Sequence, residues 1–132
     1  MKAISPRSIT IIMLLLFNCA SAQEKSQMVR LAKLVIDSTQ LDRYKTFLKE
    51  EIEVSLRAEP GVLTLYAVSD KNNPTHITIL EIYADVDAYK SHLQTPHFLK
   101  YKNGTPDMVK SLELVEAVPL AGEAGVTQKK RP

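Results

Sequence analysis

Hydrophobic and polar residues alternate in four separate runs of the chain, the pattern expected of β-strands. The first run begins at Met28 and ends in three consecutive apolar residues, Leu34 to Ile36, which indicates burial on both faces. Two later runs are separated by a polar segment, Asp70 to Pro74, typical of a hairpin turn. The predicted strands are residues 28–36, 62–69, 76–84 and 111–118.

A helical period lies between the first and second predicted strands. Ser38 or Thr39 is expected to cap this long amphipathic helix, and the Pro60-Gly61 pair to end it. Charged residues fill its outer side, and we expect the pair Glu50-Glu51 to be solvated there. The apolar stripe consists of Leu41, Tyr44, Leu48, Ile52 and Ser55.

The second helical region is broken in its middle, and two of the three histidines flank the break. Thr95 and Pro96 are expected at the N-cap and first position of a new helix, because Thr accepts a bond from a free backbone N–H and Pro has none to leave unpaired. At helical spacing His92 shares an apolar face with Tyr89 and should point into the fold. His97 lies in the first turn of the next helix. An imidazole titrates near neutral pH, so this pair is the first candidate for proton transfer.

The order of the elements predicts the fold. Strand, helix, strand, strand, helix, strand is the split β-α-β pattern of α+β ferredoxin-like folds, a four-stranded antiparallel sheet with its helices on one face. Several strands are apolar on both sides, so the second face also needs a cover. A second copy of the chain is the simplest cover, and we expect a homodimer.

The N-terminus has the features of an export signal. Lys2 and Arg7 form a basic opening, an apolar run follows, and Ala20-Ser21-Ala22 is a small-residue cleavage site. The apolar run is shorter than the roughly 20 residues of a transmembrane helix. We therefore expect cleavage after Ala22, an exported (periplasmic or secreted) protein and no transmembrane segment in the mature chain.

An alternative processing site includes Cys19. The segment Leu16 to Cys19 faintly resembles a lipoprotein signal, although Asn18 stands where a small residue is usual, and this reading anchors the protein through Cys19. The predicted organisation is a signal peptide (1–22), a disordered linker (23–27), one domain (28–120) and a flexible tail (121–132).

Charge and composition exclude several classes of function. Without Lys2 and Arg7, 15 basic residues balance 15 acidic ones, and three of the basic residues lie in the tail at 129–131. Nucleic-acid binding requires basic residues gathered on one face, so none is expected. A chain cleaved after Ala22 has no cysteine, hence no disulfide and no thiolate nucleophile.

A metal site is not expected from spacing alone. His92 and His97 are five residues apart, which on one continuous helix would separate them by about 140°. The break at Pro96 could bring them together, but the sequence indicates no clear position for a third ligand.

Four short segments occur in a characteristic order and spacing: Glu59-Pro60-Gly61, Asn73-Pro74, Glu81-Ile82-Tyr83 and His92 to Phe98. Together they resemble the antibiotic biosynthesis monooxygenase (ABM) domain of the quinol-monooxygenase type over about residues 28–118. The resemblance implies a dimeric α+β barrel that oxidises quinols or polycyclic phenols with molecular oxygen and without a cofactor. Other members degrade haem or isomerise small carbonyl compounds, so the fold does not decide the reaction.

The haem-degrading branch is not expected. A resemblance to that branch would require an Asn on the first strand, a Trp after the third-strand Glu and an iron-ligating His late in the second helical region. At the matching positions this chain has Leu31, Tyr83 and Lys102.

Proton removal from a quinol gives an electron-rich anion that can reduce oxygen, so the protein needs a base, an apolar pocket and hydrogen-bond partners. We assign His92 as the base, His97 and Tyr83 as groups that orient the substrate, and Glu81 as the group that fixes an imidazole tautomer. An isomerase, and a small-molecule-binding or stress module without turnover, remain open alternatives. The predicted substrate-binding residues are Tyr44, Phe47, Ser55, Tyr66 and Phe98.

Overall fold

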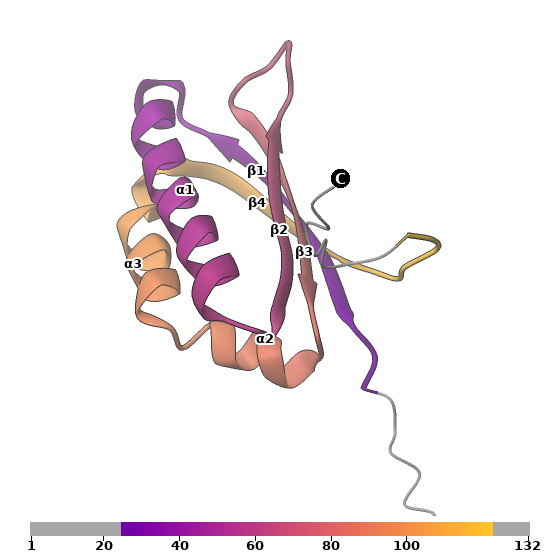
Figure 1. Cartoon of the computed structure of the whole chain (residues 1–132). Helices are drawn as coiled ribbons and strands as arrows, with labels where there is room; N and C mark the ends of the chain where they lie inside the picture. Colours follow the sequence, from indigo (N-terminus) through magenta and orange to yellow (C-terminus); the bar gives the residue numbers. More distant parts are fainter. Residues whose placement is uncertain (1–24, 123–132) are drawn as a thin grey trace, which may run out of the picture.

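A computed structural model describes residues 25–122 as a four-stranded antiparallel sheet with its helices on one face (Figure 1). The predicted α+β ferredoxin-like fold is confirmed, with strand order β2-β3-β1-β4. The predicted signal peptide and tail residues 123–132 lie outside the described residues. The elements are β1 (Met28–Ile36), the 3₁₀ turn η1 (Ser38–Gln40), α1 (Leu41–Ala58), β2 (Val62–Ser69), β3 (His76–Tyr83), α2 (Val86–His92), α3 (Pro96–Gly104), the 3₁₀ turn η2 (Pro106–Met108) and β4 (Val109–Ala117).

The strand register decides which side chains lie under the helices. Leu34 of β1 pairs with Ile77 of β3 and Leu112 of β4, and all three point to the helix-covered face. On the same face Arg30 of β1 is the register partner of Glu81 of β3, so a basic and an acidic residue lie side by side on the helix side of the sheet.

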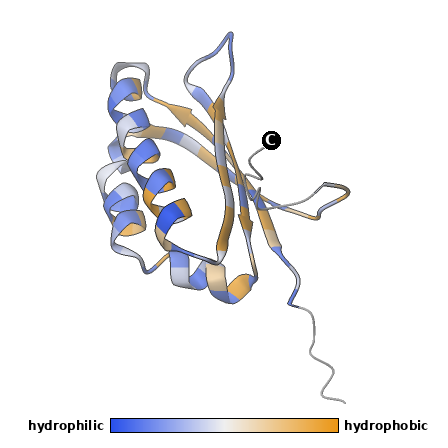
Figure 2. Cartoon of the chain, in the orientation of Figure 1, coloured by the Kyte–Doolittle hydropathy of each residue, from blue (hydrophilic) through white to orange (hydrophobic). Residues whose placement is uncertain are grey.

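One hydrophobic core fills the space between α1 and the sheet. Buried residues of β1, β3 and α1 form it, and Met108 of η2 closes one end. Figure 2 shows hydrophilic residues on the outward sides of the helices and hydrophobic residues along the strands. The buried members of this core are Ala32, Leu34, Ile36, Tyr44, Leu48, Ile77, Ile79 and Met108.

Two features of α1 differ from the prediction. Asp37, not Ser38 or Thr39, is the capping residue, and it caps η1 by accepting a hydrogen bond from the backbone N–H of Thr39 at 2.8 Å. Glu51 is only 5% exposed, so its predicted solvation is wrong, whereas Glu50 is exposed. The reason is periodic: residues 44, 48, 51 and 55 are separated by three or four positions and form the buried stripe of the helix.

The break between α2 and α3 follows the prediction. Thr95 caps α3, its side chain accepting a hydrogen bond from the backbone N–H of Phe98, and Pro96 is the first helical residue.

Gly61, just before β2, lets α2 approach closely, because a Cβ at Gly61 would lie 2.6 Å from the Cβ of Ala88. The backbone oxygen of Gly61 also accepts a hydrogen bond from the N–H of Ala84 at 2.8 Å. These contacts position α2 and its last residue, His92.

No helix of residues 25–122 covers the opposite face of the sheet, which is apolar in its centre (Figure 1). Leu31 of β1 lies between Leu80 of β3 and Val115 of β4, and Tyr66 of β2 is 65% exposed beside Leu80.

Among residues 25–122, no helix is long and apolar enough to cross a bilayer.

Candidate functional site

The turn between α2 and α3 brings His92 and His97 together, with ring centroids 6.3 Å apart. The hydroxyl of Thr95 donates a hydrogen bond of 2.8 Å to the backbone oxygen of His92, which ties the end of α2 to the start of α3. His92 is 2% exposed, as its spacing from Tyr89 predicts.

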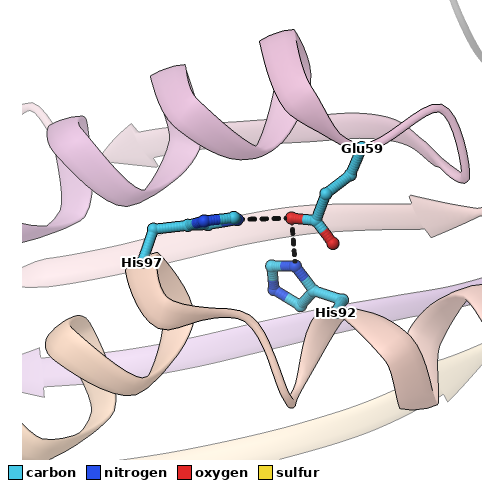
Figure 3. A group of neighbouring side chains, drawn as sticks. All are labelled: Glu59, His92 and His97. Atoms are coloured by element: carbon cyan, nitrogen blue, oxygen red, sulfur yellow. Dashed lines mark hydrogen bonds and ion pairs between the residues drawn. The ribbon is translucent and has the colours of Figure 1, made fainter.

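Glu59 joins the two imidazoles (Figure 3). Its Oε2 accepts hydrogen bonds from Nδ1 of His92 at 3.0 Å and from Nε2 of His97 at 2.6 Å. Glu59 is the C-cap residue of α1, and its backbone N–H donates to the oxygen of Ser55. Burial alone would raise the pKa of Glu59, but the hydrogen bonds from His97 and His92 outweigh it and lower that pKa.

A second carboxyl group lies on the other side of His92. Oε1 of Glu51 is 3.3 Å from Nε2 of His92, and the hydroxyl of Ser55 donates to the same oxygen at 2.9 Å. Burial raises the pKa of Glu51, and the bond from Ser55 and the nearby imidazoles offset only part of this. His92 therefore lies between two carboxyl groups that differ in their affinity for a proton.

A cavity of about 580 Å³ extends from His92 between the helices and the sheet. Its walls are mainly apolar, and Leu112 and Leu114 of β4, about half exposed, line it on the side that α3 leaves open. Glu51 lines the cavity and Glu59 does not, so the Nε2 edge of His92 is on the cavity side and the Nδ1 edge is on the Glu59 side.

Glu81 also lines the cavity, but it is not among the carboxylates in contact with an imidazole; those are Glu51 and Glu59. Instead Oε2 of Glu81 accepts a hydrogen bond from the hydroxyl of Tyr83 at 3.3 Å. Burial raises the pKa of Glu81, against the opposing effects of Arg30 and Tyr83. The carboxylate placed to fix an imidazole tautomer is therefore Glu59, and not Glu81 as predicted from the sequence.

Tyr83 lies behind the cavity wall. It is 1% exposed, its ring centroid is 5.4 Å from that of His92, and burial raises the pKa of its hydroxyl. Neither Tyr83 nor His97 lines the cavity, so neither is placed to orient a substrate there as predicted. Tyr83 instead hydrogen-bonds Glu81 and packs on the imidazole of His92. Next to it, Nη1 of Arg30 donates to the hydroxyl of Tyr89 at 2.7 Å, and Tyr89 lines the cavity.

The five predicted substrate-binding residues separate into three groups. Phe98 lines the cavity, with its ring 4.9 Å from that of His92. Tyr44 and Ser55 are completely buried and each contacts a lining residue: the hydroxyl of Tyr44 is 2.7 Å from that of Tyr101, and Ser55 holds Glu51.

Phe47 and Tyr66 differ from the prediction, because neither lines this cavity. Phe47 packs against the core beside Gly104, where a Cβ would lie 2.5 Å from its ring. Tyr66 pairs with Leu80 and therefore points to the opposite face of the sheet. The alternation of β2 places Tyr66 and Thr64 together, but a register shift between Val62 and Thr64 decides which face they occupy.

The site also contains residues that sequence reasoning missed. Glu51, Tyr89 and Tyr101 line the cavity, and burial raises the pKa of Tyr101 to about 12. The sequence offered no clear third metal ligand beside His92 and His97, and the structure supplies one, Glu59. Each of the three residues offers one possible ligand atom, and these atoms lie within 4.8 Å of one another. The place of Glu59 immediately before Pro60-Gly61, at the forced end of α1, is the signal that could have identified it.

Comparison with known proteins identifies the family of this chain. The family model of antibiotic biosynthesis monooxygenase matches residues 28–104. A structure from Bacteroides thetaiotaomicron, described as a candidate antibiotic biosynthesis monooxygenase, is 62% identical over 73% of this chain and 91% of that one, with a TM-score of 0.72. No curated protein matches the chain.

More distant structures share the fold. A candidate monooxygenase from Lactobacillus acidophilus is 30% identical with a TM-score of 0.69, over 74% of this chain and 46% of that one. A candidate antibiotic biosynthesis monooxygenase from Nitrosomonas europaea is 20% identical with a TM-score of 0.67, over 71% of this chain and 90% of that one. The extent of the family match and the identity to the Bacteroides structure lead to one conclusion: this chain belongs to the antibiotic biosynthesis monooxygenase family.

Proposed function

We propose that this protein is a cofactor-independent monooxygenase that oxidises a quinol or a small phenol with molecular oxygen. The observation that carries the proposal is the buried imidazole of His92, held by Glu59 on one edge and open to a mainly apolar cavity on the other. Family membership supports monooxygenase chemistry, and the cavity supports a small, largely apolar substrate.

His92 is the general base of this proposal. Its Nε2 takes a phenolic proton, while Glu59 accepts the Nδ1–H, keeps the ring in one orientation and stabilises the imidazolium that forms. At 3.3 Å, the contact to Glu51 is longer than a charge-assisted hydrogen bond of about 2.8 Å, so Nε2 remains accessible to a substrate hydroxyl. The apolar walls exclude water and strengthen these electrostatic interactions.

The quinol anion then supplies the electrons. It reduces O₂, one oxygen atom enters the ring to give a hydroxyquinone, and the other leaves as water with the two hydrogen atoms that the quinol loses. The chain's own contribution is proton removal, orientation of the substrate and a dry cavity.

An isomerase of a small carbonyl compound is the second candidate. The observation in its favour is the pair of proton-carrying groups, Glu51 and His92, side by side at one end of the cavity. One group could remove a proton from carbon while the other returns one to the neighbouring atom. A binding module without turnover uses the same cavity and needs neither group.

We also propose a homodimer that buries the apolar face of the sheet around Leu31, Leu80 and Val115. A contiguous apolar surface of this kind is normally covered in a stable protein. The second copy in this proposal covers the sheet from the side opposite to the helices, and the cavity of each copy remains on its own helix side.

Export is a further part of the proposal and rests on residues 1–22, which lie outside the described residues. Their basic opening, apolar run and small-residue site support a signal peptide. Anchoring through Cys19 is the alternative.

Oxygen uptake with a panel of quinols tests the catalytic proposal. We expect His92→Gln to reduce the rate by about 10²- to 10⁴-fold, the usual contribution of a positioned base. His76→Gln, at the exposed start of β3, is the matched control and should retain the wild-type rate. Equal rates in wild type and His92→Gln would exclude His92 as the base, and quinol binding without oxygen uptake would favour the alternatives.

The buried carboxyl of Glu51 predicts a pH-dependent stability. Because the pKa of Glu51 is raised in the folded state, the folded protein holds this proton more tightly than the unfolded chain, and stability falls as pH rises above the unfolded pKa of about 4.3. Glu51→Gln removes this ionisation, so its free energy of unfolding should exceed that of wild type at pH 8 and approach it at pH 4.

Urea unfolding at the two pH values measures this difference. Glu50→Gln changes the exposed neighbour and should show no comparable gain. A stability difference between Glu51→Gln and wild type that is the same at both pH values would contradict the argument.

Light scattering after gel filtration tests the dimer. Leu31→Asp places a charge in the centre of the apolar face and should convert the protein to a monomer. Leu99→Asp, at a 40% exposed leucine on α3, is the matched control and should leave the dimer intact. A wild-type mass of one chain would exclude the dimer.

Intact-mass measurement of the protein made in a bacterium with an export pathway tests the processing site. We expect a chain that begins at Gln23. A lipid-modified chain that begins at Cys19 would favour the alternative, and an uncleaved chain would exclude both.

A further inference from the structure

We propose that Glu59, His92 and His97 form a binding site for a divalent transition metal, with zinc as the best fit. This inference goes beyond the proposed oxidation of a quinol, which uses the other edge of His92. It also differs from the expectation drawn from histidine spacing alone, because the fold supplies the third group at the end of α1 (Figure 3).

The chemistry and spacing of the three groups suit zinc. Two imidazoles and one carboxylate are a frequent zinc ligand set, with bonds of about 2.0–2.2 Å that place tetrahedral ligand atoms about 3.3 Å apart. Here the Oε2–Nδ1 and Oε2–Nε2 distances are 3.0 and 2.6 Å, and all three ligand atoms lie within 4.8 Å of one another. The two distances to Oε2 would have to lengthen by only about 0.3 and 0.7 Å to admit the ion, which would replace the two protons that Glu59 now accepts.

The surroundings of His92 resemble the outer shell of a metal site. A ligating histidine usually donates its other N–H to a carboxylate, which fixes its tautomer. Glu51 lies 3.3 Å from Nε2 of His92 and is itself held by Ser55. With Nε2–H directed at Glu51, the Nδ1 lone pair points toward Glu59 and His97.

The site is supported by rigid elements and can be reached from outside. Its three side chains come from the end of α1, the end of α2 and the first turn of α3, and those of Glu59 and His97 are 13% and 14% exposed. A pocket of about 210 Å³ adjoins Glu59 and is lined also by Ser91 and Thr95. Neither histidine lines this pocket, so it gives the ion a route to the Glu59 side of the site.

Metal binding and base catalysis exclude each other at His92. With the metal on Nδ1, the proton of the neutral ring is on Nε2 instead, so Nε2 cannot accept one from a substrate. Metal binding is therefore expected to inhibit the oxidation; this consequence, unlike the site itself, depends on the proposed function.

Titration of the full untagged chain with Zn²⁺, and with Co²⁺ as a spectroscopic probe, tests the site. A Cys19→Ser background removes the single thiol as a competing ligand. We expect one equivalent of metal, a visible Co²⁺ spectrum of four- or five-coordinate type, and a rise in melting temperature with zinc. Glu51→Gln should weaken binding by about 10- to 100-fold, as is typical of an outer-shell carboxylate.

Ligand variants provide the decisive comparison. Glu59→Gln and His97→Gln should each weaken zinc binding by more than about 100-fold, and His76→Gln should bind as wild type does. Circular dichroism of the metal-free variants separates loss of a ligand from loss of the fold. His97 is partly exposed, so its variant keeps the test valid if Glu59→Gln unfolds.

Two results would overturn the site: no stoichiometric binding to wild type, or unchanged affinity in a folded His97→Gln. Stoichiometric metal binding in a protein without oxygen uptake would support the site while contradicting the proposed function. Oxygen uptake that continues unchanged with metal bound would overturn the inhibition.

Discussion

The carboxylate of Glu59 is the interaction on which the site depends. It accepts hydrogen bonds from two imidazoles on different helices and orients both, from the residue at which α1 ends. A partly buried carboxylate with two N–H donors is well compensated, whereas the same group with one donor missing would be costly. The Glu59 carboxylate needs both N–H donors, so the end of α2 and the start of α3 must stay next to the end of α1.

A second layer of hydrogen bonds extends this arrangement into the core. Ser55 donates a hydrogen bond to Glu51, Glu51 faces His92, and the hydroxyls of Tyr44 and Tyr101 join α1 to α3 at the cavity wall. Completely buried Ser55 and Tyr44 lie on the same stripe of α1. The face of α1 that builds the core thus also supports the polar end of the cavity, so folding and site formation use the same helix face.

Much of the fold was predictable because its signals are local. Alternation along Met28–Ile36, the turn residues before His76 and the Thr95-Pro96 pair each act through their own backbone, and the elements follow them. The site was less predictable. Burial of Glu51 depends on α2 and α3 packing over α1, and the role of Glu59 depends on the meeting of three helix ends, which no single segment encodes. Tyr66 shows the same limit, since a register shift in β2 decides its face.

The two ends of the cavity differ in how well they tolerate substitutions. Around His92 almost every polar atom has a partner, so a replacement there disturbs several contacts at once. Leu112 and Leu114 of β4 bound the same space while about half exposed, and changes in their size cost little folding free energy. Within this architecture, the shape of the cavity can diverge along β4 while the hydrogen-bonded end around His92 stays constant.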